Sequence, residues 1–136
     1  MSLSKVFTIS LVIAKYAGEF ENTKGAAAPN VQMRMLDISL KGGGSIRIDT
    51  KSENCVFIFS ILGDITVGNT EISEKTAVRF EEGGYIEVSA QKDATFIYFE
   101  APPLREPIAW GGPIVMNTRE ELNKAFEDLR NNTFIK

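Results

Sequence analysis

The architecture of this chain is indicated most directly by residues Gly112 to Phe134, which read GPIVMNTREELNKAFEDLRNNTF. Thr118 is placed to cap a helix, because its hydroxyl can accept from the backbone N–H of Glu121 while the Glu121 carboxylate reaches back to the Thr118 amide. Apolar residues then recur at helical spacing, at Leu122, Ala125, Phe126 and Leu129. The segment therefore predicts an amphipathic helix that packs on something larger.

The chain upstream of this helix reads as short strands rich in β-branched and aromatic residues, each bounded by Gly, Asn or Asp. An apolar run from Val6 to Ala14 predicts the first strand, and Gly63-Asp64 fits a tight hairpin. The run from Val56 to Ile61 is apolar on both faces, which predicts a central strand covered on both sides. The other predicted strands are 31–40, 45–50, 65–67, 76–80, 85–90 and 95–99. Many short strands at this spacing indicate a β-sandwich or barrel.

Apolar and polar residues alternate in two of these strands, which predicts one buried and one wet face for each. The apolar positions are Ile46, Ile48, Ile86 and Val88. The lone Cys55 cannot form an internal disulfide, and its apolar neighbours predict a small buried side chain in a reducing compartment, the cytoplasm.

Length and composition agree with one compact domain. A chain of 136 residues buries enough surface for one core without metal or disulfide support. The net charge of −3 and the pI near 5.1 give no basic surface, so we expect no direct nucleic-acid binding. The apolar run near the N-terminus is too short to span a bilayer, so we expect no membrane association.

The chain contains no histidine. This excludes Ser-His-Asp and Cys-His arrangements, and also metal centres built on two or three imidazoles. The densest carboxylate pair, Glu81-Glu82, would point to opposite faces of a strand and precedes Gly83-Gly84, which predicts a solvated turn. We therefore predict no catalytic residue, no metal site and no cofactor for this chain.

Gln32 and Arg34 are candidate ligand-binding residues. They share one face of the strand 31–40 with the apolar residues Leu36, Ile38 and Leu40. If that face lines a barrel, both polar side chains point into its mouth, where an arginine would pair with a carboxylate or bind an anionic ligand. We favour the alternative, a bulge near Asp37 that switches the register. In that alternative the inward residues are Val31, Met33 and Met35.

Trp110 is the third candidate, in a loop rich in Gly and Pro. It could stack against a ligand or partner. We favour a role as an anchor that pins the loop to the barrel wall or to a neighbouring domain.

The C-terminal residues resemble the end of the pirin family. The run Ala101 to Pro107 and the segment Gly18-Glu19-Phe20 with Lys24-Gly25 extend the resemblance from Ile9 to Phe134. The matching C-terminal residues are Pro113, Val115, Met116, Asn117, Thr118, Glu120, Glu121, Ala125, Phe126, Asp128 and Phe134.

Pirins consist of two consecutive cupin β-barrels, and the resemblance implies that this chain corresponds to the second. The implied fold is all-β, a single cupin-type jelly-roll barrel or sandwich with a short C-terminal α-helix. Residues 1–136 would form one domain, with the loop and helix 101–136 packed on the barrel. Pirin metal ligands lie in the first barrel, which agrees with a chain that lacks histidine.

The leading functional hypothesis is a non-catalytic, metal-free cupin module that acts in structure, domain packing or partner interaction. It predicts an exposed apolar patch, covered in a homodimer or by a pirin N-terminal-type cupin barrel. One alternative is small-molecule binding in the barrel interior. Another is a part in a quercetin 2,3-dioxygenase-like pirin whose metal site lies in an N-terminal barrel; this chain alone would then not be an enzyme.

Overall fold

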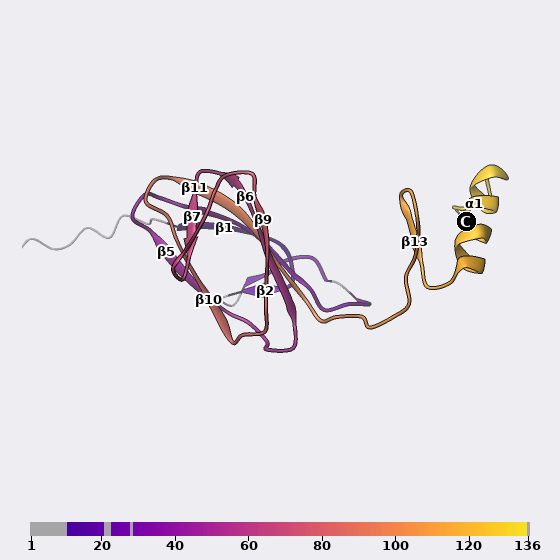
Figure 1. Ribbon diagram of the computed structural model, residues 1–136, viewed down its shortest axis with the longest axis horizontal. Coiled ribbons are helices and arrows are strands. Elements are labelled where there is room, and N and C mark those ends of the chain that lie inside the picture. The colour runs from indigo at the N-terminus through magenta and orange to yellow at the C-terminus, as the bar shows by residue number, and fades with distance from the viewer. Residues whose placement is uncertain (1–10, 21–22, 28, 136) are drawn as a thin grey trace, which may run out of the picture. The chain divides into compact units, whose positions relative to one another are not determined.

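The computed structural model describes residues 11–20, 23–27 and 29–135, and these fall into two compact units that divide after Pro103. The first unit consists of strands and loops, and the second contains the one helix of the described residues (Figure 1). The strand predicted from Val6 to Ala14 begins outside the described residues. Its remaining part lies in β1 (Leu11–Ala17).

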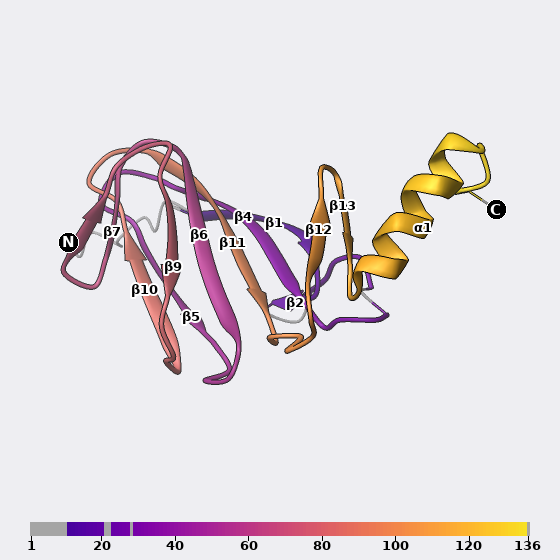
Figure 2. The ribbon, with the colours of Figure 1, turned by 45° about the vertical axis from the view of Figure 1, so that its right-hand side comes forward.

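The first unit contains two antiparallel sheets that pack as two layers around one apolar core (Figure 2). The order in the five-stranded sheet is β1, β4 (Arg34–Leu40), β11 (Ala94–Ala101), β6 (Cys55–Leu62) and β9 (Ala77–Phe80). The order in the four-stranded sheet is β5 (Ser45–Asp49), β10 (Tyr85–Ser89), β7 (Ile65–Val67) and β8 (Thr70–Ile72). A separate ladder joins β2 (Glu19–Phe20) and β3 (Thr23–Lys24).

The core is built by the alternation that the sequence predicts. In β5 and β10 the aliphatic residues Ile46, Ile48, Ile86 and Val88 are buried, whereas Arg47 and Glu87 are exposed. The five-stranded sheet supplies side chains with no exposed area, which are Leu36, Ile38, Ile58, Phe96 and Tyr98. Each sheet thus buries one of its faces against the other sheet, as in a β-sandwich.

Most connections carry the chain from one sheet to the other. The hairpin predicted at Gly63-Asp64 is wrong, because β6 pairs with β9 and β11 while β7 pairs with β8 and β10. Gly63 has φ +73°, and a Cβ there would lie 2.5 Å from the backbone oxygen of Asp93, so glycine allows this corner. Repeated crossing between two layers is the jelly-roll pattern, which confirms the all-β fold class.

The outward face of β6 is not covered as predicted. β6 is a central strand, but Phe57 is 41% exposed and Cys55 is exposed rather than buried. The reason is the pleat, since only every second residue of β6 reaches the core.

The second unit contains a hairpin of β12 (Ala109–Gly111) and β13 (Ile114–Met116), followed by α1 (Arg119–Arg130). The predicted capping box is present, with Glu121 N donating to Thr118 Oγ1 at 3.2 Å and Thr118 N donating to Glu121 Oε2 at 3.0 Å. Leu122 and Ala125 are buried with Ile114.

The predicted apolar stripe of the helix is shorter than expected, because Leu129 is 45% exposed. The small cluster formed with the hairpin covers only the first part of the helix. The packing of residues 101–136 on the barrel stays a prediction. In the described part of the chain, no helix has the length and apolar character needed to cross a membrane.

Thr118→Ala should lower the free energy of unfolding of the helical unit by about 1 kcal/mol, because the Glu121 backbone N–H loses the hydroxyl oxygen that accepts its hydrogen bond. Urea denaturation followed by far-UV circular dichroism measures this loss. Thr118→Ser keeps the hydroxyl and should stay close to wild type. Equal losses in both variants would contradict the cap.

Candidate functional site

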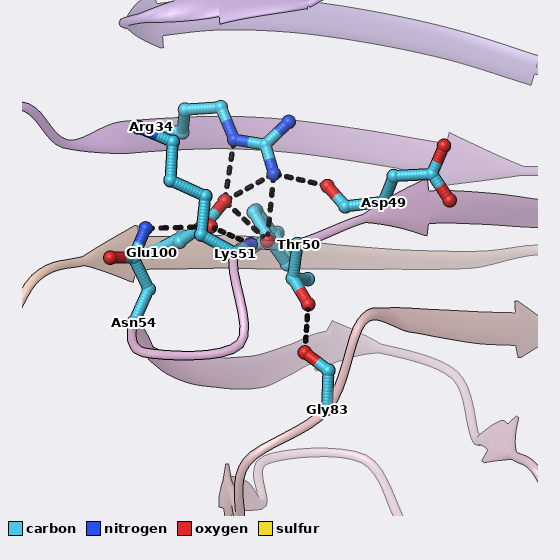
Figure 3. Close-up of polar contacts among 8 residues, drawn as sticks. Arg34, Asp49, Thr50, Lys51, Asn54, Gly83 and Glu100 are labelled. Carbon is cyan, nitrogen blue, oxygen red and sulfur yellow. Dashed lines mark hydrogen bonds and ion pairs between the residues drawn. The ribbon is translucent and has the colours of Figure 1, made fainter.

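A buried carboxylate lies at one end of the first unit. Glu100 follows Phe96 and Tyr98 on the inward face of β11 and is only 3% exposed. Its Oε1 atom accepts from the Lys51 backbone amide at 3.0 Å and from Asn54 Nδ2 at 2.8 Å. Its Oε2 atom accepts from the Tyr98 hydroxyl at 2.9 Å. Glu100 therefore ties β11 to the loop between β5 and β6 (Figure 3).

Arg34 completes this network from the neighbouring strand. β4 and β11 are antiparallel and place Arg34 directly opposite Glu100. Arg34 Nε donates to Glu100 Oε2 at 2.6 Å, and Nη2 contacts the same oxygen. Nη2 also donates to the backbone oxygen of Asp49 at 2.5 Å and to the Tyr98 hydroxyl oxygen at 3.3 Å. The expectation that an inward Arg34 would pair with a carboxylate is confirmed.

The alternative register that we favoured from the sequence is wrong. β4 and β11 pair residue by residue from Arg34 to Leu40, without a bulge near Asp37. The register shift in the pairing of β4 with β1 lies on β1, between Lys15 and Ala17. The cost of turning Arg34 inward is met by Glu100, so no switch of register is needed.

The electrostatics of the network fix its protonation. Burial raises the pKa of the Glu100 carboxyl, but hydrogen bonds from the Lys51 amide, Asn54, Arg34 and Tyr98 outweigh burial and hold that pKa below its ordinary value of 4.5. Burial raises the pKa of the Tyr98 phenol, and its hydrogen bond to Glu100 acts in the same direction. At neutral pH the carboxylate is charged, and Tyr98 keeps the proton that it donates.

A cavity of about 650 Å³ adjoins the network. It lies among the turn after β1, the segment before β4, the loop after β5 and the end of β11. Arg34 and Gln32 both line it, so the structure brings these two predicted residues together. The other lining residues are Gly18, Glu19, Lys24, Gly25, Ala26, Ala27, Met33, Asp49, Thr50, Lys51, Asn54 and Glu100.

Trp110 belongs to the second unit, on β12. It is 71% exposed, and its Nε1 donates to the Gly112 backbone oxygen at 2.6 Å. Within its own unit it is therefore not a buried anchor. Its predicted roles in ligand stacking or in pinning the loop to the barrel remain predictions.

Sequence reasoning missed Glu100, Tyr98, Asn54 and Lys51. The signal for the first two was available, because alternate residues 94, 96, 98 and 100 point inward once the predicted strand 95–99 is extended by one residue at each end. An acidic residue on such a face predicts a buried partner for an inward arginine. Nothing in the sequence indicates that the loop residues Lys51 and Asn54 fold back on Glu100.

The residues of this chain do not fit a metal centre of the histidine-rich cupin kind. The sequence supplies no imidazole, and the described residues contain no group of three Cys, Asp or Glu able to hold an ion. The buried carboxylate of Glu100 already accepts from backbone, amide, guanidinium and phenol donors. Its lone pairs are therefore not free for a metal.

The family model of the Pirin C-terminal cupin domain matches residues 35–135. Human pirin is 31% identical over 128 residues, which cover 89% of this chain and 44% of that protein. Arabidopsis thaliana pirin-1 is 28% identical over 122 residues, covering 85% and 42%. A crystal structure of quercetin 2,3-dioxygenase from Acinetobacter baumannii aligns with TM-score 0.85 and 27% identity, covering 98% of this chain and 46% of that one. This chain spans less than half the length of these relatives, and the structural match supports a cupin β-sandwich.

Glu100→Gln should lower the free energy of unfolding by about 3 kcal/mol near pH 7, because Arg34 loses its charged partner. The expected loss lies at the lower end of the range for a broken buried pair, because 23% of the Arg34 side chain is exposed. Urea denaturation monitored on the β-sheet signal measures this loss. A change below about 0.5 kcal/mol would contradict the network.

The same variant should change the pH dependence of stability. The pKa of Glu100 is lower in the folded protein than in the unfolded chain, so its contribution is present above the ordinary value of 4.5 and is lost as the pH falls through the folded-state pKa. The stability advantage of wild type over Glu100→Gln should therefore shrink below pH 4.5. The exposed Asp93 also has a lowered pKa, from its hydrogen bonds to Lys41 and Gly42, and Asp93→Asn should leave most of the wild-type pH dependence intact.

Proposed function

The chain belongs to the pirin family as a C-terminal cupin domain, and from this premise we propose that it is a non-catalytic assembly module that packs against a second copy of itself through the outer face of its five-stranded sheet. We call this surface the aromatic face, and it comprises Phe57 and Phe59 on β6 and Ile97 and Phe99 on β11. The aromatic face is the observation on which the proposal rests.

The aromatic face is continuous across two central strands. Phe57 pairs with Phe99 and Phe59 pairs with Ile97 across the ladder. The rings of Phe57 and Phe99 stack with centroids 4.4 Å apart and planes 13° apart. Phe57 is 41% exposed, and the other three side chains are partly exposed. Contiguous apolar surface of this kind is typical of interaction sites.

A second copy fits this face on grounds of chemistry and symmetry. The four side chains carry no charge, so a two-fold contact brings no like charges together at its centre. Stacked sheets pack about 10 Å apart with interdigitated apolar side chains, which a face of aromatic and β-branched residues provides. The relatives are more than twice as long as this chain, so in them further chain is available to cover the equivalent surface. A pirin N-terminal-type barrel is the competing occupant.

The absence of imidazole from the sequence supports a non-catalytic role. Cupin oxygenases depend on an open metal site, and the donor set of this chain does not provide one. Activity of the quercetin 2,3-dioxygenase kind would require a histidine-bearing barrel in addition to this chain. We also propose a cytoplasmic location, because one cysteine forms no internal disulfide.

Size-exclusion chromatography with light scattering should give a mass of twice the 15.0 kDa monomer. Phe57→Glu should shift the protein to the monomer, because it introduces a charge into the centre of the contact. Tyr85→Glu is the matched control, since Tyr85 is 50% exposed on β10 of the other sheet; it should leave the dimer intact. Circular dichroism confirms that both variants fold.

A wild-type monomer at about 100 μM would contradict the dimer. Binding of that monomer to the N-terminal barrel of human pirin would then assign the aromatic face to a different cupin. Loss of the dimer in both variants would also contradict the proposed surface.

Iron(II) added to the purified chain and removed by desalting should leave less than about one tenth of an equivalent bound, because nitrogen donors are missing. Oxygen uptake with quercetin as substrate should stay at the background rate. Stoichiometric retained iron together with consumption of quercetin would overturn the non-catalytic assignment.

A further inference from the structure

We propose that the cavity beside Arg34 binds a small organic carboxylate, with Arg34 Nη1 and the Lys51 ammonium donating to its oxygens and the wall near Met33 contacting its apolar body. This site is separate from the aromatic face and does not depend on the proposed assembly. The volume of about 650 Å³ is in the range of small-molecule sites.

The first argument is that the carboxylates lining the cavity are already engaged, whereas two of its charged donors are not. Arg34, Lys24 and Lys51 line the cavity together with three carboxylates. Glu100 is saturated within the network, and Asp49 accepts from Arg47 Nε at 3.2 Å. The third carboxylate is that of Glu19, and its Oε1 atom lies 4.0 Å from Lys24 Nζ.

Two donors remain once these contacts are counted. Among the described residues, no ion pair or hydrogen bond engages the Lys51 side chain, and no hydrogen bond engages Arg34 Nη1. Figure 3 shows this terminal nitrogen of Arg34 without a partner among the residues drawn. No buried side-chain nitrogen in the described residues lacks a partner, so Nη1 is not fully buried. A ligand carboxylate would supply an acceptor for both donors and a negative charge for Lys51.

The second argument is that Arg34 is already fixed. Its Nε and Nη2 atoms are held by Glu100, the Asp49 backbone oxygen and Tyr98. The guanidinium is planar, so fixing one edge also fixes the direction of Nη1. Binding an acceptor therefore costs little additional side-chain entropy.

The two donors have different parts in recognition. Glu100 neutralises Arg34, so Nη1 contributes a directed hydrogen bond and little net charge. Lys51 is exposed and has no carboxylate partner among the described residues, so it contributes the net positive charge. This combination fits a monoanion better than a dianion.

The remaining wall selects the body of the ligand. Met33 is partly buried, and the neighbouring lining residues Gly18, Ala26 and Ala27 are small. Gly18 has φ +79°, and a Cβ there would lie 2.5 Å from the Met33 backbone oxygen, so only glycine lets the chain turn this closely at the wall. Small and apolar lining leaves room for a hydrocarbon or aromatic body attached to the carboxylate.

Benzoate is a suitable probe, and its neutral analogue benzamide has nearly the same shape. In ¹H–¹⁵N correlation spectra of the full chain, benzoate should shift the amides of Gly18, Gln32 and Lys51 in a saturable way, with Kd of about 1 mM. Benzamide should give no saturable shift up to about 20 mM, because it lacks the charge. Absence of saturable benzoate shifts, or equal binding of benzamide, would overturn the proposal.

Lys51→Gln should weaken benzoate binding by about twofold to fivefold, the range for one exposed ion pair. Lys92→Gln is the matched control, since Lys92 is an exposed lysine that does not line the cavity; its Kd should equal that of wild type. An equal loss in both variants would indicate nonspecific charge attraction and overturn the site.

Arg34→Lys tests the directed hydrogen bond, because it keeps a cation beside Glu100 but removes Nη1. If this variant folds, judged by its amide dispersion, it should lose the benzoate shifts at Gly18 and Gln32. Wild-type binding by the folded variant would contradict the role of Arg34. If it does not fold, the comparison of Lys51→Gln with Lys92→Gln decides the question.

Discussion

A charged carboxylate buried at the end of an apolar sandwich is the constraint on which the arrangement of the first unit depends. Glu100 is 3% exposed, and an unpaired carboxylate there would be strongly destabilising. Its hydrogen bonds come from β4, from β11 itself and from the loop between β5 and β6. The loop between β5 and β6 connects the two sheets. The Glu100 carboxylate therefore fixes the position of this loop against the ends of β4 and β11.

The value of this network lies in the geometry that it imposes more than in stability. A buried ion pair can often be replaced by apolar side chains of similar volume without loss of stability. Such a replacement here would leave the Lys51 amide and the Asn54 side chain without their acceptor. The loop would then lose the hydrogen bonds that hold it against β11. It would also remove the guanidinium edge from the cavity. The ion pair therefore shapes the binding surface, while the apolar core supplies most of the folding free energy.

The sequence predicted those features that local rules determine. The capping box of α1 and the alternation in β5 and β10 follow from residues close together in the chain. The passage of the chain from one sheet to the other at Gly63 could not be predicted. A tight turn between two apolar strands has the same sequence pattern whether the strands pair with each other or enter different sheets. The register of β4 depended on whether Arg34 had a partner, and that partner lies 66 positions away. Local reasoning therefore favoured the bulge, whereas the structure contains the ion pair.

Strand β11 connects the two surfaces that we assign to binding. Its inward residues Tyr98 and Glu100 hold Arg34, and its outward residues Ile97 and Phe99 form half of the aromatic face. A slip of β11 by one residue would turn the Glu100 carboxylate outward and the Phe99 ring into the core. The polar network and the aromatic face therefore require the same register of β11. A partner on the aromatic face would add burial to the outward side of β11 and so favour the register that keeps Glu100 inward. Assembly on one face of the sheet would thus stabilise the polar network behind it without any contact between partner and ligand.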